Sequence, residues 1–206
     1  MQCGLLTLSS QQGDYEGAAT YFSNTASSYA ERRWSLVDTI MLKMYAECLR
    51  KLDRKDEYCR TMLDILAKSA ARARSRLLPR VSAQDGRQVT ARSRFDWLDD
   101  DKIDTTGFLT ELIAYSEQLP NYITAPLAKY LEDVIVEPYI RHIDNKDGFE
   151  LRVRFRHLLE DDLNMQRIRV RLVSMSSQEK EIWLETEDHL VVRRGPVKVW
   201  VKTNVC

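Results

Sequence analysis

The sequence FELRVRFR at residues 149–156 decides the structural class of the second half of the chain. Its apolar side chains, from Phe149 to Phe155, alternate with charged ones. Successive side chains of a β-strand point to opposite faces, so the pattern predicts a strand with one face in a core and the other in solvent. The sequence NKDG at residues 145–148 stands directly before it and predicts a tight turn.

Further runs with this two-residue period stand on both sides of it. Apolar and charged residues alternate at 167–172 and mostly at 197–201, and Ile182 and Leu184 make a shorter run. The run at 134–140 contains Pro138, which cannot donate a ladder hydrogen bond and therefore predicts an edge strand. Short strands separated by turns favour an antiparallel, immunoglobulin-like β-sandwich, here a partial one with fewer than the seven or so strands of a complete module.

The first seventy residues show the helical period instead. Apolar side chains recur three or four residues apart from Leu36 through Ile40 and Met44 to Leu52, from Tyr58 to Ala70 and from Tyr15 to Ala26. Asp53-Arg54 predicts a break between the later two helices. The sequence GDYE at 13–16 matches the turn and second helix of a tetratricopeptide-like repeat. We therefore predict an α-solenoid of helix pairs, with an ordinary helical bundle as the alternative.

A segment without periodicity joins the two halves. Residues 77–104 contain Pro79, Asp85-Gly86 and three consecutive aspartates at 99–101, which predict an exposed, irregular loop. A helix is expected after Thr105-Thr106-Gly107, where a threonine side chain can cap it. The prediction is an α+β chain, with a helical repeat region at 1–131 and a β-sandwich module at 132–206. Because both patterns stop abruptly at the ends, we expect a piece of a larger protein.

Composition narrows the function classes. The 206 residues hold 31 basic and 31 acidic side chains, so no overall field attracts nucleic acid or an anionic membrane. No apolar run approaches the roughly 20 residues of a membrane span, and no secretory signal opens the sequence. Four scattered cysteines without CxxC spacing favour a reducing compartment and burial as small apolar side chains.

Basic side chains are concentrated in two places. Residues 71–94 hold seven arginines against one aspartate. Three arginines at 152, 154 and 156 and three at 167, 169 and 171 would line one sheet face if their two strands are neighbours. The candidate interaction surface comprises Arg72, Arg74, Arg76, Arg80, Arg152, Arg154, Arg156, Arg169 and Arg171. These residues can dock an acidic partner or pair within the chain; nucleic-acid binding and peripheral membrane contact are the alternatives.

No pattern typical of catalysis occurs. The chain lacks phosphate-binding glycine loops, nucleophile elbows and calcium loops. The histidines, at positions 142, 157 and 189, have no metal-ligand spacing, and we expect His157 to continue the charged side of its strand with Arg154 and Arg156. We therefore expect no enzyme and no catalytic, cofactor-binding or metal-binding residues.

Several stretches resemble one family of trafficking proteins. YAERRW at 29–34, MYAECL at 44–49 and EYC at 57–59 are similar to the late helical region of the large subunit specific to the TRAPP II complex (transport protein particle). IVEPYI at 135–140, DGF at 147–149 and the runs DDL at 161–163 and IRVRLVS at 168–174 resemble the β-modules that follow in that subunit. The residues from Leu190 to Gly195 and from Val197 to Val201 fit the same modules.

The resemblance implies a cytoplasmic assembly, peripheral at the trans-Golgi, that tethers vesicles and activates Rab-type GTPases by nucleotide exchange. In that family small core subunits build the exchange site, and the large subunit is a non-catalytic scaffold. The expected partners are other TRAPP subunits and, indirectly, a Rab-type GTPase, with no nucleic acid and at most peripheral membrane contact.

Overall fold

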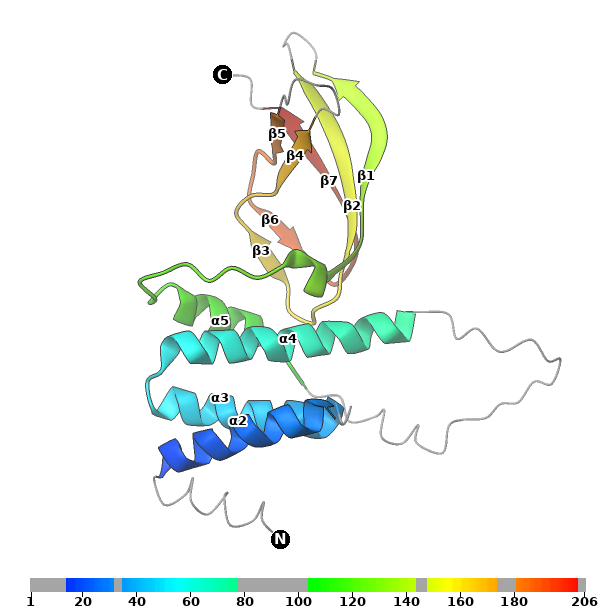
Figure 1. The fold of residues 1–206 in the computed structure, drawn as a ribbon. Coiled ribbons are helices and arrows are strands. Elements are labelled where there is room, and N and C mark those ends of the chain that lie inside the picture. Colours follow the sequence, from blue (N-terminus) through cyan, green and yellow to red (C-terminus); the bar gives the residue numbers. More distant parts are fainter. Residues whose placement is uncertain (1–13, 32–34, 78–103, 144–147, 174–180, 204–206) are drawn as a thin grey trace, which may run out of the picture. The chain divides into compact units, whose positions relative to one another are not determined.

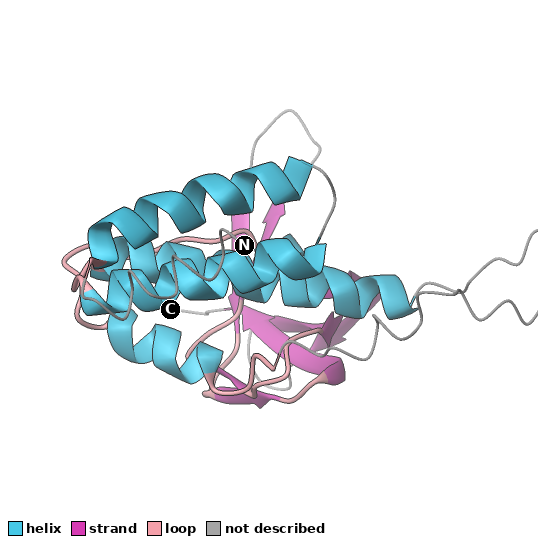
Figure 2. Ribbon diagram, turned by 90° about the horizontal axis from the view of Figure 1, so that it is seen from below, coloured by secondary structure: helices cyan, strands magenta, loops and turns pink. Residues whose placement is uncertain are grey.

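The computed structural model describes residues 14–31, 35–77, 104–143, 148–173 and 181–203. In these residues, four α-helices precede a curled antiparallel sheet with the form of a half-barrel, which confirms the α+β class (Figures 1 and 2). The chain divides into two compact units, 1–125 and 126–206. The sequence placed this boundary at 131/132, beside the start of the first strand at Leu131.

Three helices form most of the described part of the first unit. They are α2 (Tyr15–Glu31), α3 (Ser35–Lys51) and α4 (Lys55–Leu77), and α3 packs against both others (Figure 1). The Asp14 carboxylate accepts the backbone N–H of Gly17 at 3.1 Å and so caps α2. Between α3 and α4, Asp53 adopts a left-handed conformation with φ of 55°. This residue is where the sequence predicted the chain to break, and the break is confirmed.

Small side chains of α2 allow close packing on α3. Ala18, Ala19 and Phe22 form one buried cluster with Cys48. The inner face of α4 buries a second set, comprising Tyr58, Cys59, Met62, Ile65, Leu66 and Ala70. Cys48 and Cys59 are both buried and reduced, as predicted for small apolar side chains, and burial raises the pKa of each thiol. Cys3 and Cys206 lie outside the described residues.

The predicted apolar stripe of α3 is only partly buried. Ile40 and Met44 are 39% and 41% exposed, whereas Asp38 and Thr39 are buried. Two polar contacts to α4 explain the difference: Lys68 pairs with Asp38, and the Arg72 guanidinium donates to the Thr39 hydroxyl. A periodicity that counts only apolar residues cannot include such polar contacts, so it misplaces the buried side of the helix.

The predicted helix after Thr105 is α5 (Phe108–Ser116), but no threonine side chain caps it. Gly107 stands at the N-cap with φ of 83°, a conformation that favours glycine. Thr105 is buried, with its hydroxyl 3.4 Å from that of Ser69 on α4. Tyr115 packs on Tyr58 with ring centroids 4.8 Å apart, which fixes α5 on α4.

The second unit begins with the short 3-10 helix η2 (Leu127–Lys129) and continues as strands. The strands are β1 (Leu131–His142), β2 (Phe149–His157), β3 (Leu163–Met165), β4 (Arg169–Val173), β5 (Glu181–Glu185), β6 (Leu190–Val192) and β7 (Gly195–Thr203). Five pair antiparallel in the order β1-β2-β7-β5-β4, while β3 pairs with β6. The sequence did not predict β3 and β6, because three residues are too few to show a period.

The alternation that predicted β2 and β7 is confirmed by burial. Leu151, Val153 and Phe155 of β2 pack with Val199 and Val201 of β7 in the core, which β3 and β6 cover with partly buried apolar side chains. His157 corrects the prediction, because it is 1% exposed and lies on the core side of β2. Its odd number gives it the parity of Phe155, whereas Arg154 and Arg156 point outward.

Strand β1 is an edge strand, as Pro138 predicted. Its pairing with β2 shifts register between Val136 and Ile140, around Pro138, and between Glu132 and Ile135, where Asp133 has φ of 52°. Such bulges twist an edge strand and leave residues unpaired. As a result, five large apolar side chains of β1 are exposed: Val134, Ile135, Val136, Tyr139 and Ile140.

Candidate interaction surface on the sheet

The outward face of the five-stranded sheet brings the predicted strand arginines together. β2 and β4 are not neighbours, because β7 and β5 lie between them. The condition under which the arginines were expected to share a face is therefore wrong. The arginines of β2 and of β4 nevertheless lie on the same face, because the cross-strand register aligns their positions through β7 and β5.

One row of this face is a ladder of alternating charge. In register across the sheet stand Arg169 of β4, Glu185 of β5, Lys202 of β7, Glu150 of β2 and Arg141 of β1. Arg169 contacts Glu185 at 2.5 Å and Arg141 contacts Glu150 at 3.3 Å. Opposite charges on neighbouring strands stabilise a sheet by a few tenths of a kcal/mol to about 1 kcal/mol per pair. This row therefore serves the sheet's own stability.

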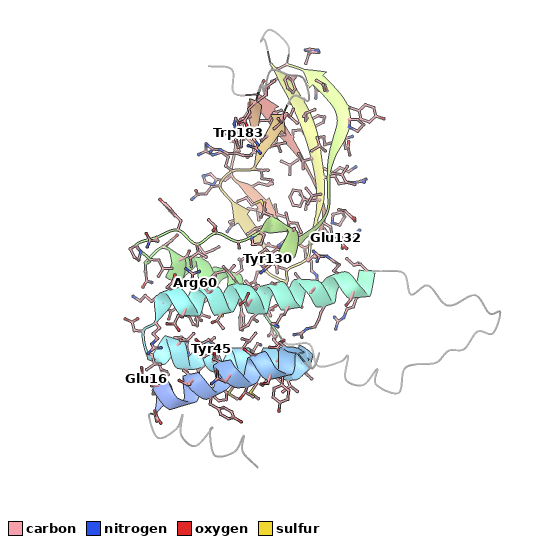
Figure 3. All side chains as sticks on the ribbon, viewed as in Figure 1. Glu16, Tyr45, Arg60, Tyr130, Glu132 and Trp183 are labelled. Atoms are coloured by element: carbon pink, nitrogen blue, oxygen red, sulfur yellow. The ribbon has the colours of Figure 1, made fainter. Side chains whose placement is uncertain are left out.

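Two further arginines of the candidate surface are also paired. Arg152 binds Glu137 of β1 and lies over the ring of Trp200 on β7, 5.3 Å from its centroid. Arg171 contacts Glu181 of β5 at 3.3 Å, next to Trp183, which projects from β5 (Figure 3). Their charges are compensated within the sheet.

Arg154 and Arg156 differ from these paired arginines. Lys198 of β7 stands directly opposite Arg154, and Pro196 stands opposite Arg156. Within the described ranges, no carboxylate makes an ion pair with Arg154, Arg156 or Lys198. We call these three residues the basic triad. Lys198 was not singled out from the sequence, although its place between Val197 and Val199 gives it the outward parity.

The helical arginines lie at the end of α4. Arg72 is partly buried, donates to Thr39, and has its pKa lowered by burial and by the nearby charge of Arg76. Arg74 and Arg76 occupy the last turn of α4, where positive charges interact favourably with the helix dipole and stabilise the helix. Arg80 lies outside the described residues. Arg72 thus contributes to helix packing rather than to an open binding surface.

The three histidines lie in different surroundings. His142 ends β1 and His189 precedes β6, and both side chains are exposed. Neither ring nitrogen of buried His157 makes a hydrogen bond of acceptable geometry in the described part of the chain, although the backbone of Arg193 lies close. Burial lowers the pKa of His157 and outweighs Arg193 and the Asp162 charge, which act in the opposite direction.

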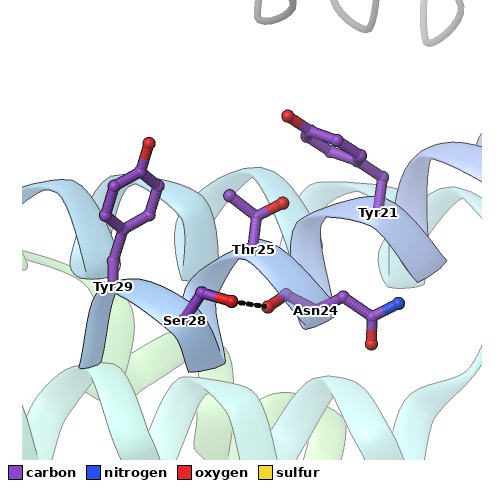
Figure 4. Close-up of a pocket in the computed structure, with 5 residues that line it drawn as sticks. All are labelled: Tyr21, Asn24, Thr25, Ser28 and Tyr29. Atoms are coloured by element: carbon purple, nitrogen blue, oxygen red, sulfur yellow. Dashed lines mark hydrogen bonds between the residues drawn. The ribbon is translucent and has the colours of Figure 1, made fainter. Parts of the chain in front are cut away.

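Two depressions of about 310 Å³ each stand out on the surface. The described residues that line the first are Tyr21, Asn24, Thr25, Ser28 and Tyr29 of α2 (Figure 4). The second lies beside the charge ladder, where Glu150 and Lys202 meet His189 and Trp200. No group of three or more metal-ligating side chains gathers among the residues described, and none of the described helices has the length and apolar character to cross a bilayer.

The chain was also compared with known proteins. No protein-family model matches it, and no curated protein is significantly similar to it in sequence.

Proposed function

We propose that this chain is part of a non-catalytic scaffold subunit of a TRAPP II-type tethering complex. In this role it binds other subunits, which carry out nucleotide exchange on a Rab-type GTPase at the cytoplasmic face of the trans-Golgi. The stretches at 29–34, 44–49 and 135–140 that resemble the large subunit of that complex support the proposal. The succession of a helical unit and an antiparallel sheet agrees with the order of parts that the resemblance implies.

The observation that carries the scaffold role is the apolar surface of β1. Tyr139 and Ile140 are 72% and 62% exposed, and Val134, Ile135 and Val136 lie beside them on the same strand. Exposed apolar side chains concentrated on one edge strand favour a protein-protein contact along that strand, because burying them against a partner removes them from water. A neighbouring subunit or module of the complex is the partner that the proposal assigns to this strand.

Two finer features of the fold belong to the same proposal. The side-by-side packing of α2, α3 and α4 is compatible with a section of an α-solenoid, in which each helix buries one face on the next. The strands β2 and β7 would be central strands of an immunoglobulin-like module. In a complete module of that kind seven strands divide into sheets of four and three, whereas here five pair in one sheet and two in another.

Affinity capture of the tagged protein from cells, followed by mass spectrometry, tests the proposal. Recovery of other TRAPP subunits is expected, and their absence would reject the assignment. The variant Ile140→Asp places a charge on β1 and should reduce the recovery. Val191→Asp is the matched control, since Val191 of β6 is 60% exposed but belongs to the other, two-stranded sheet. Equal recovery with both variants would show that β1 is not the contact.

A further inference from the structure

The basic triad is the part of the outward sheet face where, among the described residues, no carboxylate forms an ion pair with the cations. Arg154 and Lys198 face each other across β2 and β7, and Arg156 follows two residues along β2. The neighbouring cations Arg141, Arg152, Arg167, Arg169, Arg171 and Lys202 each contact a carboxylate. Three like charges on adjacent positions repel one another, so their concentration stabilises the sheet less than a mixed arrangement would.

We propose that the basic triad is a docking site for an extended, acidic segment of a protein partner. The inference rests on the proposed function, because it names the chemistry of one partner contact of the scaffold. Carboxylates of such a segment would form the ion pairs that the described residues do not form with the triad. Complementary charge of this kind speeds association and selects among partners.

The spacing of the triad favours an extended segment. Arg154 and Arg156 stand two residues apart on one strand, a separation of about 6.6–6.8 Å along the chain. Aspartate or glutamate side chains at alternate positions of an extended peptide have the same separation and the same direction. Lys198 lies beside Arg154 on the next strand, so a carboxylate over Arg154 can contact both cations.

An apolar side chain completes the site. Ile135 of β1 stands opposite Arg154 on the same face and is 42% exposed. An apolar side chain of the partner segment that projects to the same side as its acids would bury Ile135 while the carboxylates reach the triad. The same partner segment would then be bound by both ionic and apolar contacts, whereas a purely ionic site would offer only the first kind.

The carboxylates beside the triad disfavour larger polyanions. Glu132 stands opposite Arg156 on β1, and Glu137 is bound to Arg152. The dense phosphates of nucleic acid and the charged surface of an anionic bilayer extend well beyond three side chains and would be brought against these acids. A short peptide can place its own acids over the triad alone.

Fluorescence anisotropy with a defined probe tests the inference. The probe is a labelled heptapeptide of alternating glutamate and valine, and the reference is the same peptide with glutamine in place of glutamate. At physiological salt the 206-residue chain should bind the acidic probe and not the reference. The triple variant R154Q/R156Q/K198Q should weaken binding about tenfold, since it removes up to three exposed charge contacts.

The matched control is R167Q/R169Q/R171Q, which removes three positive charges from the same sheet. Charges more than a Debye length of about 8 Å away are screened, so this variant should weaken binding by less than about threefold. Circular dichroism checks that both triple variants fold. If the first does not, Arg154→Gln alone should still lower the affinity about threefold.

Three results would overturn the inference: no binding of the acidic probe by the unaltered chain, equal losses in the two triple variants, or tighter binding to phosphatidylserine vesicles or to a single-stranded oligonucleotide than to the probe. Failure here is separable from failure of the scaffold proposal. That proposal falls only if affinity capture recovers no TRAPP subunit, whatever the peptide result.

Discussion

Replacement of buried His157 by leucine should make the protein more stable and less sensitive to acid. The ring lies in the core with the parity of Phe155, and neither of its nitrogens makes a well-formed hydrogen bond to the described residues. A buried polar group left unsatisfied costs about 1–3 kcal/mol, whereas leucine of similar volume has no such group. At about pH 7 the variant His157→Leu should therefore gain about 1 kcal/mol in free energy of unfolding.

The acid sensitivity follows from the lowered pKa of His157 in the fold. The unfolded ring accepts a proton near its ordinary pKa of about 6.5, while the folded ring accepts one only at lower pH. The unfolded state thus binds more protons, and stability falls as the pH drops below about 6.5. Between about pH 7 and pH 5.5 the loss is at most about 1 kcal/mol, reached if the folded ring stays neutral.

Urea unfolding followed by tryptophan fluorescence measures both effects, since Trp183 and Trp200 lie in the sheet. The free energy of unfolding is compared at the two pH values for the unaltered chain and for His157→Leu. Subtracting one difference from the other removes the contribution of the carboxylates that the two proteins share. A change of about 1 kcal/mol in this double difference is expected.

The two exposed histidines, His142 and His189, provide a control for the buried one. The double variant His142→Gln/His189→Gln changes only exposed rings and should leave the free energy of unfolding at about pH 7 unchanged. If His157→Leu unfolds with the same pH difference as the unaltered chain, or is less stable at both pH values, the buried ring is satisfied and the reasoning is wrong.

Three further predictions concern stability and are checked by chemical or thermal unfolding. Phe155→Ala should cost about 3–5 kcal/mol, because it leaves a cavity between the sheet and β3–β6; a loss under 1 kcal/mol would mean that the core collapses around it. Gly107→Ala should cost about 1 kcal/mol, because its φ of 83° strains a side chain although nothing lies within 4 Å of the added carbon; unchanged stability would contradict the left-handed cap. Asp38→Ala should cost about 2 kcal/mol, since Lys68 loses its partner in a partly buried site, whereas Asp56→Ala, in an exposed pair, should cost under 1 kcal/mol.

The elements that the sequence predicted well are those in which one period repeats several times. β2 and β7 are long enough to show the two-residue alternation, and α2 and α4 show the helical one. The break at Asp53 and the edge position of β1 also follow from single residues whose backbone preferences are local. Such patterns depend only on residues that are close in the sequence, so they can be recognised before the fold is known.

The predictions that needed correction depend on contacts between distant residues. Asp38 and Thr39 of α3 are buried because Lys68 and Arg72 of α4 meet them. For His157 the local pattern was sufficient, because its odd position gives it the parity of buried Phe155. The prediction was wrong because it grouped His157 with the neighbouring charged side chains instead of using that parity. The candidate surface was predicted as a list of arginines, and the list could not say which of them have a partner.

The amino-acid sequence alone determined where the longer helices and strands form, because their periods show which side of each element faces the core. Only the tertiary structure decided which arginines of the sheet have a carboxylate partner and which can bind another molecule. The order β1-β2-β7-β5-β4 places carboxylates beside Arg152, Arg169 and Arg171, whereas no carboxylate of the described residues contacts Arg154. The strand order decides which residues, far apart in the sequence, stand next to each other in the sheet, and no local sequence pattern encodes that order.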